Sequence, residues 1–226
     1  MEGNELIPEI ARQKGLKTVV GAWISNDKER NEREINSLIA LANAGVVNIA
    51  AIGNEVLHRG EITEQELLQY IKRVRQALPV SIPVGYVDAY YQFLDRPALV
   101  DACDVVLANC YPFWEGADNQ YAISYLDEMI QLTQRVANGK KVIVTETGWP
   151  SIGEPVEAAK PSSVNAMKYF IAVQEWANHK NIELFYFSSF DESWKVNQEG
   201  EVGARWGIWD KNEKIKFEIK LNTNVI

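Results

Sequence analysis

The sequence predicts an α/β fold in which a buried parallel sheet alternates with amphipathic helices. Six short apolar runs recur along the 226 residues, and longer segments with helical periodicity separate them. The apolar runs do not alternate with polar residues, which is typical of strands that are buried on both faces. Because 46% of the residues are hydrophobic, the chain can bury one sizeable core. We therefore expect a single domain over residues 1–226.

Six strands are expected, and two of them end on an acidic residue. Residues 46–54 form an apolar run that is followed directly by Glu55, and residues 141–147 form a β-branched run that contains Glu146. Strands of four to eight such residues are the usual building blocks of a parallel sheet. The other expected strands span residues 17–23, 82–88, 104–111 and 182–190.

The segments between these strands show the apolar periodicity of amphipathic helices. The clearest helix is 63–78, because Thr63 and Glu66 form a capping-box pattern and Leu67 and Ile71 lie on one face. Further helices are expected over residues 6–14, 31–44, 120–137 and 162–179, and residues 217–226 are expected to form a closing helix or a tail.

Composition excludes several classes of partner. A net charge of −8 and a pI near 5.0 argue against nucleic acid and anionic membranes, so a neutral ligand suits this surface better. Cys103 and Cys110 are the two cysteines, and we expect both to be reduced core thiols. No cluster has zinc-ligand spacing, so we expect no metal and no cofactor. We expect neither a signal peptide nor a membrane span, and the compartment stays open.

The two strand-end glutamates point to glycosidic bond cleavage. Glu146 stands just before the turn Gly148-Trp149-Pro150, and Glu55 follows Asn54. A pair of carboxyl groups at strand ends provides the acid and the nucleophile that this reaction needs. The alternatives are that Glu55 caps the helix after it and that Glu146 is a surface turn residue. His58 has no Ser or Cys nucleophile with an orienting acid, so a hydrolase triad is not expected.

Aromatic residues gather at the same strand ends. In a parallel barrel these ends share one face, where loops build active sites and flat rings can stack on sugars. The alternative is that the rings simply fill the end of the barrel. Six tryptophans follow expected strands, namely Trp23, Trp114, Trp149, Trp194, Trp206 and Trp209. The other aromatic residues expected around this cleft are Tyr90, Tyr91, Tyr111 and Phe113.

Four ordered motifs together resemble glycoside hydrolase family 17, over nearly the whole chain. They are Gly-Asn-Glu-Val at 53–56, Asn-Cys-Tyr-Pro-Phe at 109–113, Glu-Thr-Gly-Trp-Pro-Ser at 146–151 and Phe-Asp-Glu-Ser-Trp-Lys at 190–195. That family comprises β-1,3-glucanases, lichenases and β-1,3-glucan transglucosylases. The resemblance implies a (β/α)8 TIM-barrel type of fold, here a partial barrel with six of eight strands, because the strand ending in Glu55 would be the family's fourth.

The resemblance also implies roles for individual residues. Glu55 would be the general acid/base and Glu146 the nucleophile of a retaining double displacement on a neutral β-glucan. The resemblance implies Asn54, Tyr111, Glu192 and Lys195 as substrate-binding residues. The position of the aromatic rings at strand ends adds Trp114, Trp149 and Trp194. Asn54 would bind the sugar 2-hydroxyl and Tyr111 would hydrogen-bond the nucleophile. An ordinary ion pair is the alternative for Glu192 and Lys195.

Three questions stay open at this point. Six strands leave two sheet edges, so the chain either closes in a distorted way, pairs with a second copy, or is a fragment. Water or a sugar hydroxyl can release the glycosyl-enzyme, so hydrolysis and transglycosylation both fit. A catalytically silent glucan-binding partial barrel is the non-enzymatic alternative. If both glutamates act, we expect the Glu55 pKa to be raised by Glu146, and hydrogen bonds to keep the Glu146 pKa low.

Overall fold

The computed structural model describes residues 4–217, and contacts divide the chain into two compact units. Unit 1 comprises Met1–Asn109 and Met129–Thr145, and unit 2 comprises Cys110–Glu128 and Glu146–Ile226. Strand β5 and helix α5 (Ala122–Val136) each contribute residues to both units. The expectation of a closing helix or tail falls, apart from Phe217, outside the described residues.

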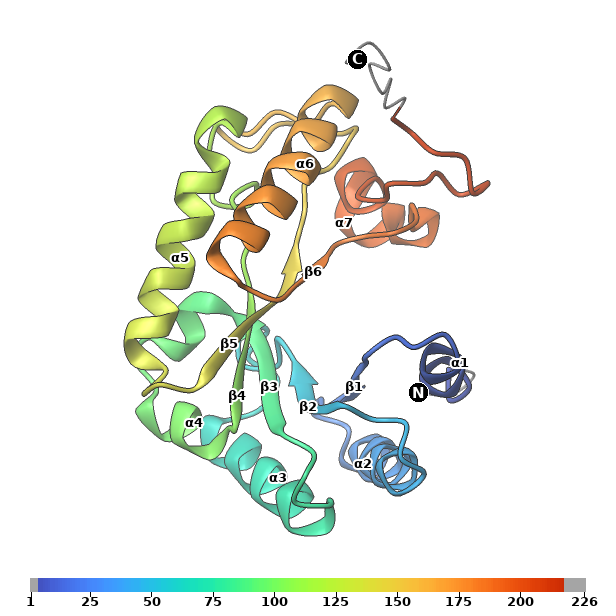
Figure 1. Ribbon diagram of the computed structural model, residues 1–226, viewed down its shortest axis with the longest axis vertical. Coiled ribbons are helices and arrows are strands. Elements are labelled where there is room, and N and C mark those ends of the chain that lie inside the picture. The colour runs from blue at the N-terminus through green and yellow to red at the C-terminus, as the bar shows by residue number, and fades with distance from the viewer. Residues whose placement is uncertain (1–3, 218–226) are drawn as a thin grey trace, which may run out of the picture. The chain divides into compact units, whose positions relative to one another are not determined.

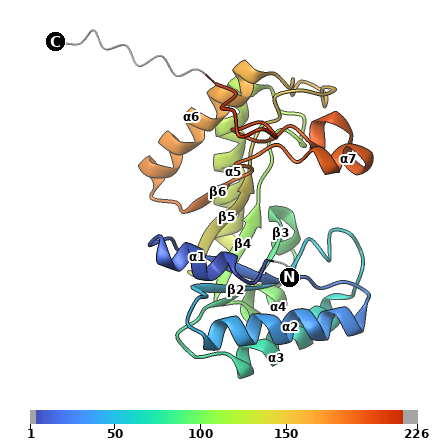
Figure 2. The ribbon, with the colours of Figure 1, turned by 90° about the vertical axis from the view of Figure 1, so that its right-hand side faces the viewer.

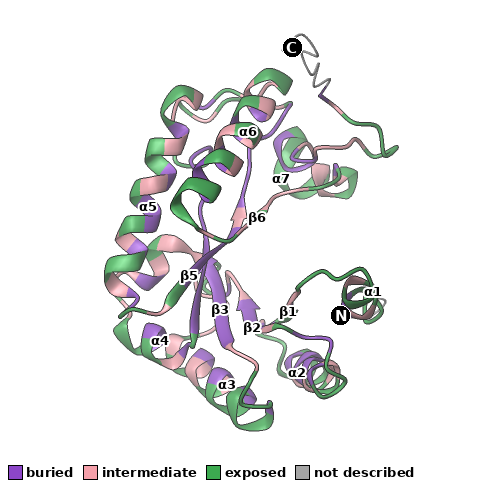
Figure 3. Ribbon diagram, viewed as in Figure 1, coloured by how far each residue is buried: buried purple, intermediate pink, exposed green. Residues whose placement is uncertain are grey.

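The six strands follow one another in chain order in a single sheet, as the sequence predicts (Figure 1). Neighbouring strands from β1 to β4 pair in parallel. Strands β2 to β5 are buried along most of their length (Figure 3), whereas β6 is not. One apolar cluster joins Ala51, Val87, Val105, Leu107 and Ile143 in unit 1. The strands are β1 (Val19–Ala22), β2 (Ile49–Asn54), β3 (Val84–Ala89), β4 (Val105–Asn109), β5 (Lys141–Thr147) and β6 (Leu184–Tyr186).

Helices of unit 1 begin where capping residues satisfy their first backbone N–H groups. The Asp27 side chain accepts a hydrogen bond from the Arg30 N–H at the start of α2, and the capping box of Thr63 and Glu66 at the start of α3 is confirmed. Helices α2 and α3 contact each other and the strands, and run side by side in Figure 2. The helical elements of unit 1 are α1 (Ile7–Gln13), α2 (Lys28–Asn43), α3 (Glu64–Ala77), η1 (Tyr90–Phe93) and α4 (Pro97–Ala102).

Unit 2 is built around buried aromatic side chains. Trp149 and Phe113 are fully buried, and Tyr169 on α6 is almost completely so. The side chains of Trp176 and Lys180 on α6 both contact the Asp127 carboxylate on α5, which fastens the two helices together. The remaining helical elements are η2 (Asn119–Tyr121), α6 (Ser163–Lys180), η3 (Ser193–Lys195) and α7 (Val196–Gly203).

The main error of the sequence prediction concerns the last strand. Residues 182–190 were expected to form it, but β6 ends at Tyr186. Beyond that point the backbone bonds to a later segment, since the Ser188 N–H donates to the Trp206 carbonyl and the Asp191 N–H to the Trp209 carbonyl. The short helices α4 and α7 were not anticipated. Among residues 4–217, no helix is both long and apolar enough to cross a lipid bilayer.

Candidate active site

Glu55 stands at a backbone irregularity directly after β2. The register between β2 and β3 shifts between Ala51 and Asn54, and both Gly53 (φ 85°) and Glu55 (φ 52°) have positive φ. Bulges of this kind re-aim a side chain, and strained non-glycine residues concentrate at functional sites. The Glu55 N–H donates to the Val87 carbonyl at 2.8 Å. Glu55 does not cap a helix, because the next helix, α3, is capped by Thr63.

The Glu55 carboxylate is held by an amide from β4. Asn109 Nδ2 donates to Glu55 Oε1 at 2.9 Å, and Thr145 Oγ1 donates to Asn109 Oδ1 at 2.8 Å. Asn109 is only 2% exposed, so these bonds are shielded from water. The sequence motif contained Asn109 but assigned it no role. The sequence feature that could have identified Asn109 is that β4, like β2, ends on an asparagine.

A buried carboxylate, Asp88, fixes the backbone that follows Glu55. Asp88 accepts hydrogen bonds from the Tyr86 hydroxyl and from the His58 N–H, while Tyr86 Oη accepts from the Leu57 N–H at 2.9 Å. Burial of Asp88 raises its pKa above the ordinary 3.8, although these hydrogen bonds oppose the shift. No role was predicted for Asp88 from the sequence. It nevertheless lies one residue before the end of β3, much as Glu146 lies one residue before the end of β5 and Glu55 directly follows β2.

The raised pKa of Asp88 predicts a pH-dependent stability. The native state holds the Asp88 proton more tightly than the unfolded chain, so this contribution to the free energy of unfolding is full below pH 3.8. It is lost as the pH rises through the raised native pKa. Asp88→Asn cannot ionise and should remove this part of the slope, as urea unfolding between about pH 4 and 8 would show. The same slope in both proteins would contradict the prediction.

Two aromatic side chains flank the turn after Glu55 in unit 1. The Arg59 guanidinium lies 4.9 Å from the ring centre of Trp23 and donates to the Asn54 carbonyl at 2.7 Å. The Tyr91 hydroxyl bonds to His58 Nδ1 at 2.8 Å. Trp23 and Tyr91 are both partly exposed. His58 and Arg59 therefore contact neighbouring side chains and backbone, and they are not merely solvated charges.

Glu146 lies within β5 and is bonded by a phenol in unit 2. The Tyr111 hydroxyl donates to Glu146 Oε2 at 2.6 Å, which confirms the expected hydrogen bond, and the Cys110 N–H donates to the Glu146 carbonyl at 2.8 Å. The ring of Tyr111 packs edge-on against Trp206, with centres 5.2 Å apart. A hydrogen bond donated to a carboxylate favours its ionised form, as a nucleophile requires. Glu146 is half-buried in a strand and is not a surface turn residue.

The three tryptophans expected to bind substrate have different environments. Trp149 is fully buried, donates its indole N–H to the Lys160 carbonyl at 3.0 Å and packs against Phe113. Trp114 is 45% exposed and Trp194 is 67% exposed. Both can offer a ring face to a ligand, whereas Trp149 supports the loop after Glu146. A sugar contact of Trp114 and of Trp194 stays a prediction, whereas full burial leaves Trp149 no exposed ring surface for such a contact.

Glu192 and Lys195 form an ion pair in the segment after β6. Their charged atoms lie 2.8 Å apart, and Lys195 Nζ also lies 4.5 Å from the ring centre of Phe187. Phe187 packs edge-on against Tyr111, with ring centres 6.2 Å apart, so Lys195 and Tyr111 flank the same ring. The ion pair that was the alternative interpretation is therefore present, and the expected role in sugar binding stays a prediction.

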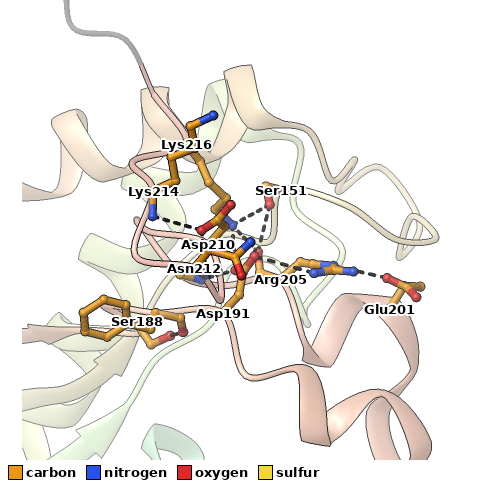
Figure 4. A network of polar contacts seen from close by, with 11 residues as sticks. Ser151, Ser188, Asp191, Glu201, Arg205, Asp210, Asn212, Lys214 and Lys216 are labelled. Atoms are coloured by element: carbon orange, nitrogen blue, oxygen red, sulfur yellow. Dashed lines mark hydrogen bonds and ion pairs between the residues drawn. The ribbon is translucent and has the colours of Figure 1, made fainter.

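A buried charge network ties the loop after Glu146 to the end of the described chain (Figure 4). Lys216 Nζ donates to Asp191 Oδ1 and to Ser151 Oγ, both at 2.7 Å. The Ser151 hydroxyl donates to the Arg205 carbonyl at 3.0 Å, and the Gly207 N–H donates to Asp191 Oδ1 at 3.0 Å. Burial lowers the pKa of Lys216, while Asp191 opposes this shift. This network was not predicted from the sequence.

Comparison with known proteins places this arrangement in a family. The sequence profile of the BtgE/BtgC glycoside hydrolase domain matches residues 1–207. A glucan 1,3-beta-glucosidase of Arthroderma benhamiae is 31% identical, with 97% of this chain and 76% of that protein aligned.

Solved structures lead to the same family. The crystal structure of a glycoside hydrolase family 17 beta-1,3-glucanosyltransferase from Rhizomucor miehei matches with a TM-score of 0.86 and 30% identity, over 95% of this chain and 79% of that one. An active-site mutant of that enzyme in complex with laminaritriose matches with a TM-score of 0.85, at 30% identity over 93% and 78% of the two chains. The profile match, these relatives and the two strand-end glutamates agree, and the chain belongs to the BtgE/BtgC glycoside hydrolase domains of glycoside hydrolase family 17.

Proposed function

We propose that the chain is an O-glycosyl hydrolase that acts on β-1,3-glucan or its oligosaccharides with retention of configuration. Glu146 is the nucleophile and Glu55 the general acid/base. The observation that carries the proposal is that each strand-end glutamate accepts a hydrogen bond from a neutral donor, Tyr111 for Glu146 and Asn109 for Glu55. The named activities of the relatives from Arthroderma benhamiae and Rhizomucor miehei supply the substrate class.

The mechanism has two displacements. Ionised Glu146 attacks the anomeric carbon while protonated Glu55 gives its proton to the leaving glycosidic oxygen, so that a covalent glycosyl-enzyme and a shortened chain result. Glu55, now ionised, takes a proton from the incoming hydroxyl, whose oxygen displaces Glu146. A retaining mechanism works with the two carboxyl groups about 5–5.5 Å apart. We propose that residues 1–226 form one catalytic domain.

The substrate-binding roles follow from chemistry and exposure. Asn54 would hydrogen-bond the sugar 2-hydroxyl beside Glu55, and the exposed rings of Trp114 and Trp194 would stack on sugar faces. Glu192 and Lys195 would bind hydroxyls through charges that already pair with each other. A neutral glucan suits a surface of net charge −8, whereas nucleic acid would be repelled.

Transglycosylation is the second candidate reaction. It is favoured by the glucanosyltransferase named among the structural relatives and by exposed tryptophans that could hold a sugar acceptor. Water and a sugar hydroxyl then compete for the same glycosyl-enzyme. A longer oligosaccharide product would show transfer, and shorter products alone would show hydrolysis.

We also propose that a second copy of the chain covers a sheet edge. β1 and β6 are the first and last strands of the sheet order. In the same unit as β1, α1 exposes Ile7 and Ile10, and Leu6 just before the helix is exposed as well. Unpaired strand edges and exposed apolar side chains favour self-association. Light scattering that gives the mass of one chain at all concentrations would contradict this proposal.

The test of the proposed function is product analysis by mass spectrometry. The purified chain is incubated with reducing-end-labelled β-1,3-gluco-oligosaccharides, with Glu146→Gln as the blank. New shorter or longer oligosaccharides that appear only with the unaltered chain are the expected result. A folded chain that yields no products but retains the oligosaccharide would be a silent glucan-binding protein, and the enzymatic proposal would be wrong.

A further inference from the structure

We propose that Asn109 is a positioning residue that decides which oxygen of Glu55 carries the catalytic proton, and that Thr145 sets the orientation of the Asn109 amide. This inference rests on the proposed role of Glu55 as general acid/base. It adds two residues that do not touch the substrate but determine how Glu55 presents its proton.

All three side chains lie in unit 1 and come from different parts of the sheet. Glu55 follows β2, Asn109 is the last residue of β4 and Thr145 lies in β5. The Asn109 amide spans β3, whose residue opposite Asn109 is the small Ala89. The two bonds, at 2.9 Å to Glu55 and 2.8 Å from Thr145, form a continuous chain of donors. Asn109 and Thr145 are both buried.

The direction of these bonds has a chemical consequence. Asn109 Nδ2 can only donate, so Glu55 Oε1 must accept and cannot also hold a proton on the same axis. The proton of the acid form is therefore directed to Oε2. A carboxylic acid that shares its proton between two oxygens would have the productive orientation only part of the time, whereas this bond selects one orientation.

Thr145 stabilises the productive orientation of the amide. If the Asn109 amide were flipped, its carbonyl oxygen would face the Glu55 carboxylate, and the Thr145 hydroxyl would have to change from donor to acceptor. The flipped state is thus disfavoured most when Glu55 is ionised, since two acceptors then face each other. Removal of the hydroxyl in Thr145→Val weakens this preference, and Thr145→Ser retains it.

The test compares substrates that need a proton with substrates that do not. Oligosaccharides have a poor leaving group and require protonation by Glu55, whereas a dinitrophenyl β-glycoside expels its leaving group without it. For Asn109→Ala we expect kcat/KM on oligosaccharides to fall about 10- to 100-fold, part of the ~10²–10⁴-fold that positioned proton transfer contributes. On the dinitrophenyl glycoside we expect a change of less than about threefold, since that step needs no acid.

The pH profile provides a second readout that a merely structural role would not move. Asn109 donates a hydrogen bond to the Glu55 carboxylate, so Asn109→Ala should move the alkaline limb of the kcat/KM profile to higher pH. Thr145→Val should show both effects to a smaller degree, and Thr145→Ser should behave as the unaltered chain. If Asn109→Ala does not fold, as circular dichroism would reveal, Thr145→Val carries the test.

Two outcomes overturn the proposal. If Asn109→Ala loses the same activity on both substrates and its pH profile is unchanged, Asn109 has only a structural role. If Asn109→Ala and Thr145→Val both keep full activity on oligosaccharides, Asn109 does not position the proton of Glu55. Failure of the proposed function is distinguishable, because then Glu55→Gln would leave oligosaccharide turnover unchanged or the unaltered chain would show none.

Discussion

Replacement of Glu146 by Gln should lower turnover of β-1,3-gluco-oligosaccharides on the order of 10⁴-fold or more, as loss of a catalytic nucleophile does in other enzymes. The amide is nearly isosteric and can still accept the hydrogen bond from Tyr111, which donates at 2.6 Å. Binding should therefore be retained while the covalent step is lost. Steady-state kinetics and calorimetric titration with the same oligosaccharide measure the two quantities separately.

Covalent trapping distinguishes the nucleophile from the acid/base. A 2-deoxy-2-fluoro glycoside with a good leaving group should add one glycosyl mass to the chain, and peptide mapping should place it on Glu146. Glu55→Gln is the matched control, because it should still be labelled and its turnover of the activated substrate should be raised by azide, which needs no general base. A label on Glu55, or a Glu146→Gln chain that retains more than about a hundredth of the activity, would contradict the assignment.

Replacement of Asp191 by Ala should destabilise the protein by about 3–5 kcal/mol, the usual cost of leaving a buried charge without its partner. Asp191 and Lys216 lie 2.7 Å apart and both side chains are largely buried, at 2% and 13% exposure. The change also removes the acceptor for the Gly207 N–H. The midpoint of urea unfolding at an unchanged slope measures the loss.

Two controls show whether the cost comes from the uncompensated charge. Combining Asp191→Asn with Lys216→Met removes both charges and keeps an acceptor for Gly207, so part of the stability should return, since buried pairs are often replaceable by neutral groups. Glu9→Gln breaks the exposed ion pair with Arg12 and should leave the midpoint of urea unfolding nearly unchanged, because exposed pairs are screened by water. A cost for Asp191→Ala no greater than for Glu9→Gln would show that the buried network contributes little.

The strand-end acids illustrate what local sequence can predict. Apolar runs of β-branched residues identified β2 and β5 well, and the polar residue at the end of each run identified Glu55 and Glu146 as candidates. The capping box of α3 was predicted residue by residue, because its bonds join Thr63 and Glu66 within one turn. Such features depend on neighbours in sequence, where periodicity and side-chain type suffice.

The extent of β6 shows where local prediction fails. Residues 188–190 have the composition of a strand, but their backbone pairs with residues 206–209 instead of continuing the strand, whereas the Phe187 N–H still donates to the Thr147 carbonyl of β5. Short α7 was missed because it is polar and contains Gly200, which has a positive φ. Competition between alternative partners for the same backbone groups is decided by packing and not by propensity.

The sequence by itself determined the α/β class, the presence of six strands, the family and the two candidate carboxylates, because these depend on apolar periodicity and on short motifs. Only the tertiary structure decided how those carboxylates are held. The bonds from Asn109 to Glu55 and from Lys216 to Asp191 join residues 54 and 25 positions apart. Packing likewise decides that Trp149 is fully buried and that Asp88 is desolvated, which raises the pKa of Asp88. Hydrogen-bond partners and desolvation arise from three-dimensional proximity, which residue type and spacing alone do not specify.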